Sequence, residues 1–151
     1  MKDIYLIFLL MILFQGYTVA DGKAHSSDSI AGHSEVERWY TPLHLQSGER
    51  LYKKHCIVCH NTDARGTLDW KKTRANGDYP PPPLNGSAHA WHHDLSTLTQ
   101  TIQDGGVPLG GVMPAFRSQL TNNEILAVIA YFQNFWSDDI YASWLELGGR
   151  E

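Results

Sequence analysis

The sequence predicts an all-α protein built from short helices that are joined by long loops. Three stretches carry apolar residues at helical spacing with capping signals at their ends, and the alternating pattern of a β-strand is nearly absent. The loops contain four consecutive prolines, Pro80 to Pro83, and a glycine-rich stretch from Gly105 to Pro114. With 151 residues, 42% of them hydrophobic, the chain suits one domain better than two with separate cores.

The first twenty residues are expected to form an export signal peptide. A polar start precedes an apolar run of 11 residues from Ile4 to Phe14, and small residues lead to Ala20, after which we expect cleavage. This run is short for a membrane span, which needs about 20 residues. An uncleaved membrane anchor and a buried core helix are the alternatives. The signal predicts a periplasmic protein, and residues 21–38, rich in Ser, Gly and His, are expected to be a flexible leader.

The first two helices are predicted from their ends. The first covers Gly48 to Cys56, with Ser47 as its N-cap. The second covers Leu95 to Asp104, with Asp94 before it as the cap and Gly105 after it as the stop. Both are short, of about two to three turns.

The third helix has the clearest signal. Thr121 and Glu124 form a capping box, and the apolar residues behind it share one helical face: Ile125, Val128, Ile129 and Phe132. Three helices of this length bury little apolar area between themselves. Long loops inside a compact domain usually indicate function or a large group to enclose. A buried cofactor would therefore supply the missing part of the core.

Both cysteines lie in one pentapeptide, Cys56-Ile57-Val58-Cys59-His60. The spacing Cys-x-x-Cys-His is that of c-type haem attachment, in which the thiols bond to the two vinyl groups and the adjacent imidazole coordinates the iron. A zinc site would need four ligands, and only the other histidines could complete one. A thioredoxin-like pair is expected in a βαβ setting, which this sequence lacks. We therefore predict one haem c, covalently bound through Cys56 and Cys59, with His60 as an iron ligand.

The second iron ligand is predicted to be Met113. It is the only methionine outside the predicted signal peptide, and it lies in a glycine-rich loop, Gly110 to Pro114, between the second and third helices. Such a loop can bring the thioether to the iron. Packing is the alternative role for a single methionine.

These features, in this order, resemble those of class I cytochromes c. In that family a glycine and an aromatic residue of the first helix pack against an aromatic residue of the last helix. A Pro-x-Leu-x-Gly segment follows the attachment site there, and the axial methionine precedes a proline. This sequence matches the pattern over about residues 47–136, with Gly48, Tyr52, Tyr131, Pro82-Pro83-Leu84-Asn85-Gly86 and Met113-Pro114.

The resemblance implies the class I cytochrome c fold, wrapped around the haem, for residues 39–136. It implies that the carbonyl of Pro82 accepts a hydrogen bond from the proximal His60 and orients it. It also implies that Leu84 packs against the haem.

Two parts depart from the compact members of that family. The stretch 61–81 is longer, so spacing does not locate the residues that contact the haem propionates. The candidates, each of which could instead be solvated or ordinary packing, are Arg65, Arg74, Tyr79, Trp70 and Trp91. The tail, residues 137–151, is expected to fold over the domain as a fourth short helix, and an exposed aromatic patch for a partner is the alternative.

Three histidines, His89, His92 and His93, lie just before the second helix. They are a weak metal signal, because no cysteine or carboxylate stands near them at a fixed spacing. A cap, a surface position or a contact to a propionate is the preferred interpretation. His55 is expected to face solvent, and His44 belongs to no pattern.

The ligand pair predicts one-electron transfer. An iron held by imidazole and thioether keeps six ligands in both oxidation states, and methionine ligation raises its potential. We therefore expect a non-enzymatic electron carrier between redox protein partners in a periplasmic chain, with the haem cycling between Fe(II) and Fe(III). The alternatives are a cytochrome subunit of a larger dehydrogenase or oxidase complex, and a haem enzyme or gas sensor in which Met113 is displaceable.

The charge distribution limits the partners. The formal net charge is −4, and no dense basic run accompanies a nucleic-acid motif, so nucleic acid is excluded as a partner. Membrane contact is expected only if the signal is retained as an anchor. Residues 50–74 hold seven basic and two acidic residues, a local charge of +5. This segment predicts a basic surface that steers acidic partners, with a solvated loop as the alternative.

Overall fold

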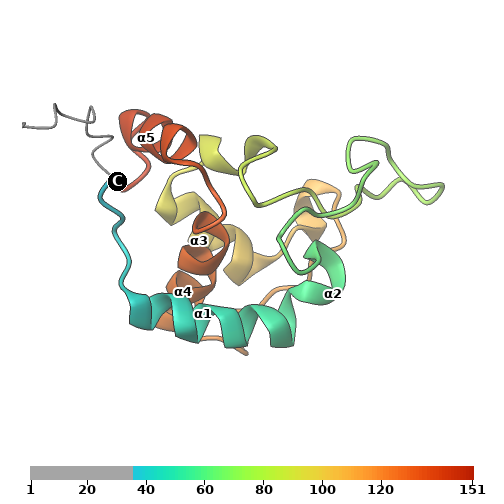
Figure 1. Cartoon of the computed structure of the whole chain (residues 1–151). Helices are drawn as coiled ribbons and strands as arrows, with labels where there is room; N and C mark the ends of the chain where they lie inside the picture. Colours follow the sequence, from blue (N-terminus) through green and yellow to red (C-terminus); the bar gives the residue numbers. More distant parts are fainter. Residues whose placement is uncertain (1–35) are drawn as a thin grey trace, which may run out of the picture. The chain divides into compact units, whose positions relative to one another are not determined.

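A computed structural model describes residues 36–151. The predicted signal peptide and most of the predicted leader lie outside this range. The described part is helical, and its only β-type pairing is an isolated bridge between Tyr79 and Gly111, so the predicted all-α class is confirmed. Within residues 36–151 no helix is long and apolar enough to span a membrane. The helical elements, drawn in Figure 1, are α1 (Pro42–His55), α2 (Ile57–His60), η1 (His89–His92), α3 (Leu95–Asp104), η2 (Val107–Leu109), α4 (Asn122–Gln133) and α5 (Asp138–Glu146).

The helix α1 begins earlier than predicted. Thr41 is its N-cap: the Thr41 hydroxyl accepts from the His44 backbone N–H at 3.4 Å, and the His44 Nδ1 accepts from the Thr41 N–H at 3.2 Å. Pro42 occupies the first helical position, where its missing N–H costs nothing. The prediction of Ser47 as the N-cap is therefore wrong, because Ser47 lies inside the helix.

The second predicted helix has the predicted bounds, and the third begins at its predicted capping box. The Asp94 carboxylate accepts from the backbone N–H of Thr97 at 2.6 Å, and α3 ends at Gly105, whose φ is +78°. The capping box of α4 is formed by Thr121 and Glu124. The helix α4 forms the centre of the core, and its buried residues are Ile125, Ala127, Val128, Ile129, Ala130, Phe132 and Gln133.

The helices α1 and α4 pack against each other at Gly48 (Figure 1). Gly48 is buried, and a Cβ atom built on it would lie 1.9 Å from the carbonyl oxygen of Ala127. The absence of a side chain therefore lets the two backbones approach. Beside this crossing, the rings of Tyr52 and Tyr131 pack with their centroids 5.1 Å apart. The structure thus brings together the three residues that the family resemblance singled out.

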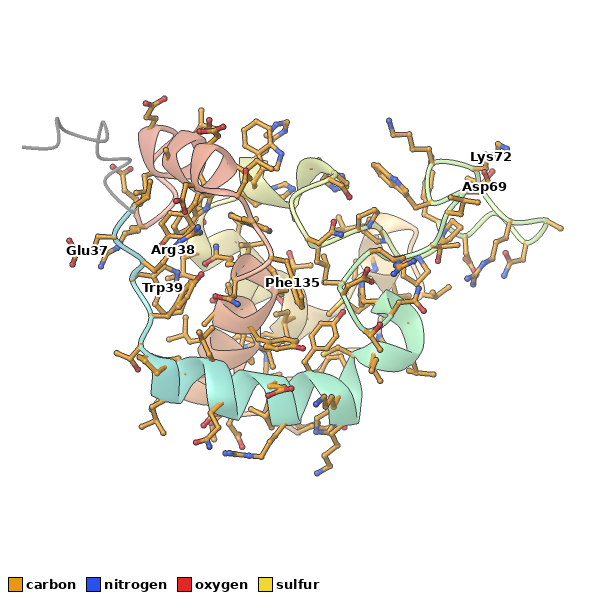
Figure 2. All side chains as sticks on the ribbon, in the orientation of Figure 1. Glu37, Arg38, Trp39, Asp69, Lys72 and Phe135 are labelled. Carbon is orange, nitrogen blue, oxygen red and sulfur yellow. The ribbon has the colours of Figure 1, made fainter. Side chains whose placement is uncertain are left out.

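The tail forms the helix α5, which is capped by Ser137. Trp144 is 0% exposed, and its indole Nε1 donates to the carbonyl of His93 at 2.8 Å. At the other end of the described chain, the Arg38 guanidinium contacts Asp138 at 2.5 Å and lies 4.1 Å from the centre of the Tyr141 ring. The segment that contains Arg38 and Trp39 is seen beside the helices in Figure 2. The tail is therefore part of the packed core.

The long stretch 61–81 extends away from the helices, as the green loop in Figure 1 shows. Its middle is exposed: Leu68 is 97% exposed. Asp69 and Lys72, labelled on this loop in Figure 2, form an ion pair at 3.1 Å. Both ends of the stretch return to the body of the protein, where the candidate site lies.

Candidate functional site

A cavity of about 440 Å³ opens beside the Cys-x-x-Cys-His pentapeptide. Pockets of this size and of mainly apolar lining are typical of cofactor sites. Its walls come from the end of α1, from α2, from the proline run, from η1 and α3, from the glycine-rich loop and from α4. All six predicted haem-binding residues line it: Cys56, Cys59, His60, Pro82, Leu84 and Met113.

His60 ends α2 and is 7% exposed. Its Nδ1 lies 3.1 Å from the carbonyl oxygen of Pro82. A carbonyl only accepts, so Nδ1 carries the proton and donates it in this bond. Burial lowers the pKa of the imidazole. The ring is therefore neutral near pH 7, and its Nε2 offers a lone pair to a metal.

The Pro82 carbonyl is placed by short backbone bonds between the turn after His60 and the proline run. The Thr67 N–H donates to Pro81 at 2.9 Å, and the Leu84 N–H donates to Ala64 at 2.7 Å. Gly66 is required in this turn: its φ is +64°, and a Cβ atom there would lie 2.4 Å from the carbonyl carbon of Pro82.

The two thiols lie one helical turn apart on the same cavity. Cys56 follows α1 and precedes α2, and Cys59 is within α2. Residues three apart on a helix share a face, which gives both sulfur atoms access to one ligand. Both are free thiols, Cys56 half-buried and Cys59 exposed. Burial, with a smaller effect of Cys59, raises the pKa of the Cys56 thiol to about 11.

Met113 lies on a loop that folds back on itself. The Gly106 N–H donates to the Met113 carbonyl at 3.0 Å, and a Cβ atom on Gly105 would lie 2.7 Å from that same oxygen. Beyond the methionine, the Phe116 N–H donates to Ile102 of α3 at 3.1 Å. The loop is thus fixed on both sides of Met113, and the half-buried thioether side chain lines the cavity.

Leu84 packs against the core and lines the cavity. Its carbonyl accepts a hydrogen bond from the indole Nε1 of Trp136 at 2.7 Å. This bond ties the segment after the prolines to the segment between α4 and α5. Gly86, two residues further, has a φ of +88° and packs against Trp136 and Ile140.

The structure separates the five candidates for propionate contacts. Trp70 and Tyr79 line the cavity, whereas Arg65, Arg74 and Trp91 do not. The guanidinium of Arg65 is paired with Asp63 at 2.6 Å.

Three histidines other than His60 line the cavity: His55, His89 and His93. The expectation that His55 faces solvent is wrong, because the ring is half-buried and packs edge-on against Phe116 at 5.9 Å. His92 packs on Trp91, with ring centroids 4.0 Å apart, and is not part of the lining. In residues 36–151, no three His, Cys, Asp or Glu side chains form a group that could bind a metal ion.

The residues of the cavity fit a covalently attached haem. Two thiols, an oriented neutral imidazole and a thioether share one cavity whose other walls are mainly apolar. Thiols are the groups that bond to the haem vinyls, and imidazole and thioether are common axial ligands of haem iron. Val128 and Phe132 of α4 line the cavity as well, so a group bound there would pack against the core helix.

Comparison with known proteins gives a matching family model and a solved structure of similar fold. Residues 44–132, more than half of the chain, match the family model described as cytochrome C oxidase, cbb3-type, subunit III. Among solved structures, the fold is similar to that of cytochrome CL from the marine methylotrophic bacterium Methylophaga aminisulfidivorans MPT. That comparison has a TM-score of 0.50 at 22% sequence identity, and it covers 73% of this chain and 67% of the other.

Proposed function

Because the chain belongs to the c-type cytochromes, electron-transfer proteins with covalently bound haem c, we propose that it carries single electrons between redox proteins through one such haem. In this proposal Cys56 and Cys59 bond to the haem vinyls, and His60 and Met113 are the axial ligands of the iron. Pro82 orients His60, and Leu84 packs against the haem. The protein is a carrier and not an enzyme.

The observation that carries the proposal is the hydrogen bond from the His60 Nδ1 to the Pro82 carbonyl, 3.1 Å long, at the wall of an apolar cavity. A buried imidazole fixed through one nitrogen presents its other nitrogen in one direction. Two free thiols and one thioether line the same cavity.

The haem supplies a one-electron Fe(III)/Fe(II) couple when it is bound. The chain contributes rigidity to that couple. Pro82 fixes the direction of His60, and the loop contacts of Gly105 and Gly106 fix Met113. Residues fixed in this way need not move when the charge of the site changes, which favours fast transfer. The apolar walls exclude water, and the thioether raises the potential relative to a second imidazole.

Two measurements test the cofactor and its ligands. Haem should stay with the denatured wild-type chain during acidic organic extraction, and Cys56→Ser or Cys59→Ser should reduce that retention. Met113→Ala should change the absorption spectrum and let the reduced protein bind carbon monoxide rapidly, whereas the wild type should not. Val107→Ala is the matched control, because Val107 lies on the same loop, 64% exposed and outside the cavity lining.

The carbon monoxide result also separates a carrier from a gas sensor or haem enzyme. Rapid binding by the reduced wild type would show that Met113 is absent from the iron or easily displaced. An unchanged spectrum in Met113→Ala would contradict the methionine ligand, and haem lost on extraction would contradict covalent attachment.

A second candidate function is a cytochrome subunit of a larger dehydrogenase or oxidase complex. The matched family model carries the name of an oxidase subunit, which favours this possibility. Gel filtration of a gently solubilised native extract distinguishes the two. A free carrier elutes near the size of one chain, and a subunit elutes with its complex.

We also propose that the partners present acidic surfaces and that the chain acts in the periplasm after export through residues 1–20. Ion pairs engage three of the seven basic residues of the segment 50–74: Lys53 with Glu49, Arg65 with Asp63 and Lys72 with Asp69. Within the described residues the other four make no ion pair: Arg50, Lys54, Lys71 and Arg74. Electron-transfer rates with the native partner should fall as ionic strength rises, and rates independent of salt would contradict steering.

A further inference from the structure

The lining of the cavity contains no lysine, arginine, aspartate or glutamate among residues 36–151. A haem brings two carboxylates, and a carboxylate next to a protein surface is stabilised by cationic or N–H donors. The haem carboxylates lie on the edge of the ring system opposite the vinyl groups. With the vinyls bonded at Cys56 and Cys59, the carboxylates point to the side of the cavity away from α2.

One group of cavity-lining side chains offers such donors away from α2. The rings of His89 and His93 lie 5.7 Å apart, and the ring of Trp70 lies 5.3 Å from that of His89. All three line the cavity. Figure 1 shows η1, which begins at His89, well separated from α2. His55, in contrast, precedes Cys56 and belongs to the attachment side.

The two histidines are held in place by the core. The backbone carbonyl of His93 accepts from the buried Trp144 indole at 2.8 Å, and its N–H donates to Ala90 at 3.3 Å. The neighbouring Asp94 caps α3. The backbone of the pair is therefore fixed while both imidazoles remain free to contact a ligand.

We propose that His89 and His93, together with Trp70, receive the carboxylate edge of the haem, and that protonation of this pair is coupled to reduction of the iron. The proposal rests on the haem attachment proposed above. It makes the reduction potential of the protein depend on pH in the neutral range, where imidazoles titrate.

The electrostatic surroundings of the pair support this role. Burial first, and then the positive charges of His93, His92 and Lys71, lower the pKa of His89. Lys71 lies over the Trp70 ring, 5.2 Å from its centre. Asp94 faces His93 and is occupied as a helix cap, and the α5 contact to this segment is the uncharged indole of Trp144.

These groups fix the sign of the coupling. A carboxylate placed among these positive groups offsets their repulsion and favours the imidazolium forms. Reduction removes one positive charge from the iron, which raises the pKa of His89. The reduction potential should therefore be highest at pH values below the pKa of the oxidised protein. It should fall with rising pH until the pH reaches the pKa of the reduced protein.

The test is a redox titration of the holoprotein at pH values from about 5 to about 9. The wild-type potential should fall with rising pH through the neutral range. The double variant His89→Gln/His93→Gln should lose at least half of that pH-dependent change. Its potential at low pH should lie below that of the wild type, close to the value that the wild type has at high pH. His92→Gln, on the same segment but outside the lining, should keep the size of the wild-type change and move its midpoint to higher pH, because a positive neighbour of His89 is removed.

A second measurement needs no variant. Histidine NMR signals should show a higher pKa for His89 in the reduced than in the oxidised protein. A wild-type potential that does not change with pH, or a double variant with the wild-type profile, would overturn the inference. Haem retention and the absorption spectrum are measured on the same samples. If the haem is covalently bound but the potential does not depend on pH, this inference fails while the proposed function is unaffected.

Discussion

Replacement of Gly48 by alanine should destabilise the protein although it adds a better helix former. A Cβ atom at this position would lie 1.9 Å from the carbonyl oxygen of Ala127, 2.7 Å from its carbonyl carbon and 2.9 Å from the Cβ of Tyr131. Two of these three atoms are backbone, so no side-chain rotation relieves the overlap. The helices α1 and α4 must separate to accept the methyl group.

The magnitude follows from that geometry. Ordinary contact begins near 3.4 Å, so the alanine Cβ and the Ala127 oxygen must move apart by about 1.5 Å. Overpacking of a core usually costs about 1–3 kcal/mol, and a clash with fixed backbone lies at the upper end. The change from glycine to alanine inside a helix returns about 1 kcal/mol. We expect a net loss of about 2 kcal/mol in the free energy of unfolding.

The assay is urea denaturation of the holoprotein, followed by tryptophan fluorescence and circular dichroism. The control is Gln46→Ala, an exposed position on the same helix, which should change the free energy of unfolding by less than about 0.5 kcal/mol. A Gly48→Ala variant as stable as the wild type, or more stable, would refute the close approach of α1 and α4 at this residue.

Two further predictions concern the helix ends that support the site. Asp94→Ala should cost about 1 kcal/mol at neutral pH, because it removes the cap on α3, while Asp94→Asn should cost less. Hydrogen bonding to the Thr97 backbone lowers the pKa of Asp94 in the folded protein. The stabilisation by this cap is therefore fully present above the unfolded pKa, which is about 3.9, and is lost as pH falls through the folded pKa. The difference in urea midpoint between wild type and Asp94→Ala should accordingly be large at pH 7 and small at about pH 2.5. Trp144→Phe should lower the free energy of unfolding by about 1–3 kcal/mol, because the His93 carbonyl loses its hydrogen-bond donor. Leu147→Ala is the control, since Leu147 is 62% exposed and its replacement should change the free energy of unfolding little. Equal urea midpoints for these two variants would contradict the role of α5.

The sequence predicted the helices whose ends follow common chemistry. Asp94 and Gly105 bound α3, and Thr121 with Glu124 starts α4, because side-chain oxygens there satisfy free backbone N–H groups. The start of α1 was missed because His44 takes the place of the usual Glu or Gln in its capping box. A proline after a threonine was the available signal.

The candidate site was predictable where bond chemistry fixes the spacing. Two thiols and an imidazole at the spacing Cys-x-x-Cys-His can bond to one haem from one side, and so Cys56, Cys59 and His60 could be named. The positions of His89, His93 and Trp70 could not be derived in this way. Trp70 approaches His89 only because the long stretch 61–81 folds back, and local sequence patterns do not encode that approach.

The length of the stretch 61–81 is compatible with a rigid site, because only its two ends position the Pro82 carbonyl. The turn after His60 is joined to the proline run through Thr67 with Pro81 and Leu84 with Ala64, so the Pro82 carbonyl is positioned by the ends alone. Closing a longer loop costs only about 0.6 kcal/mol for each doubling of its length. Residues 68–78 can therefore extend outward at little cost in stability. Within this segment the half-buried Trp70 turns back to the cavity with Lys71 over its ring, which places an indole and a positive charge beside His89 without disturbing the bond that orients His60.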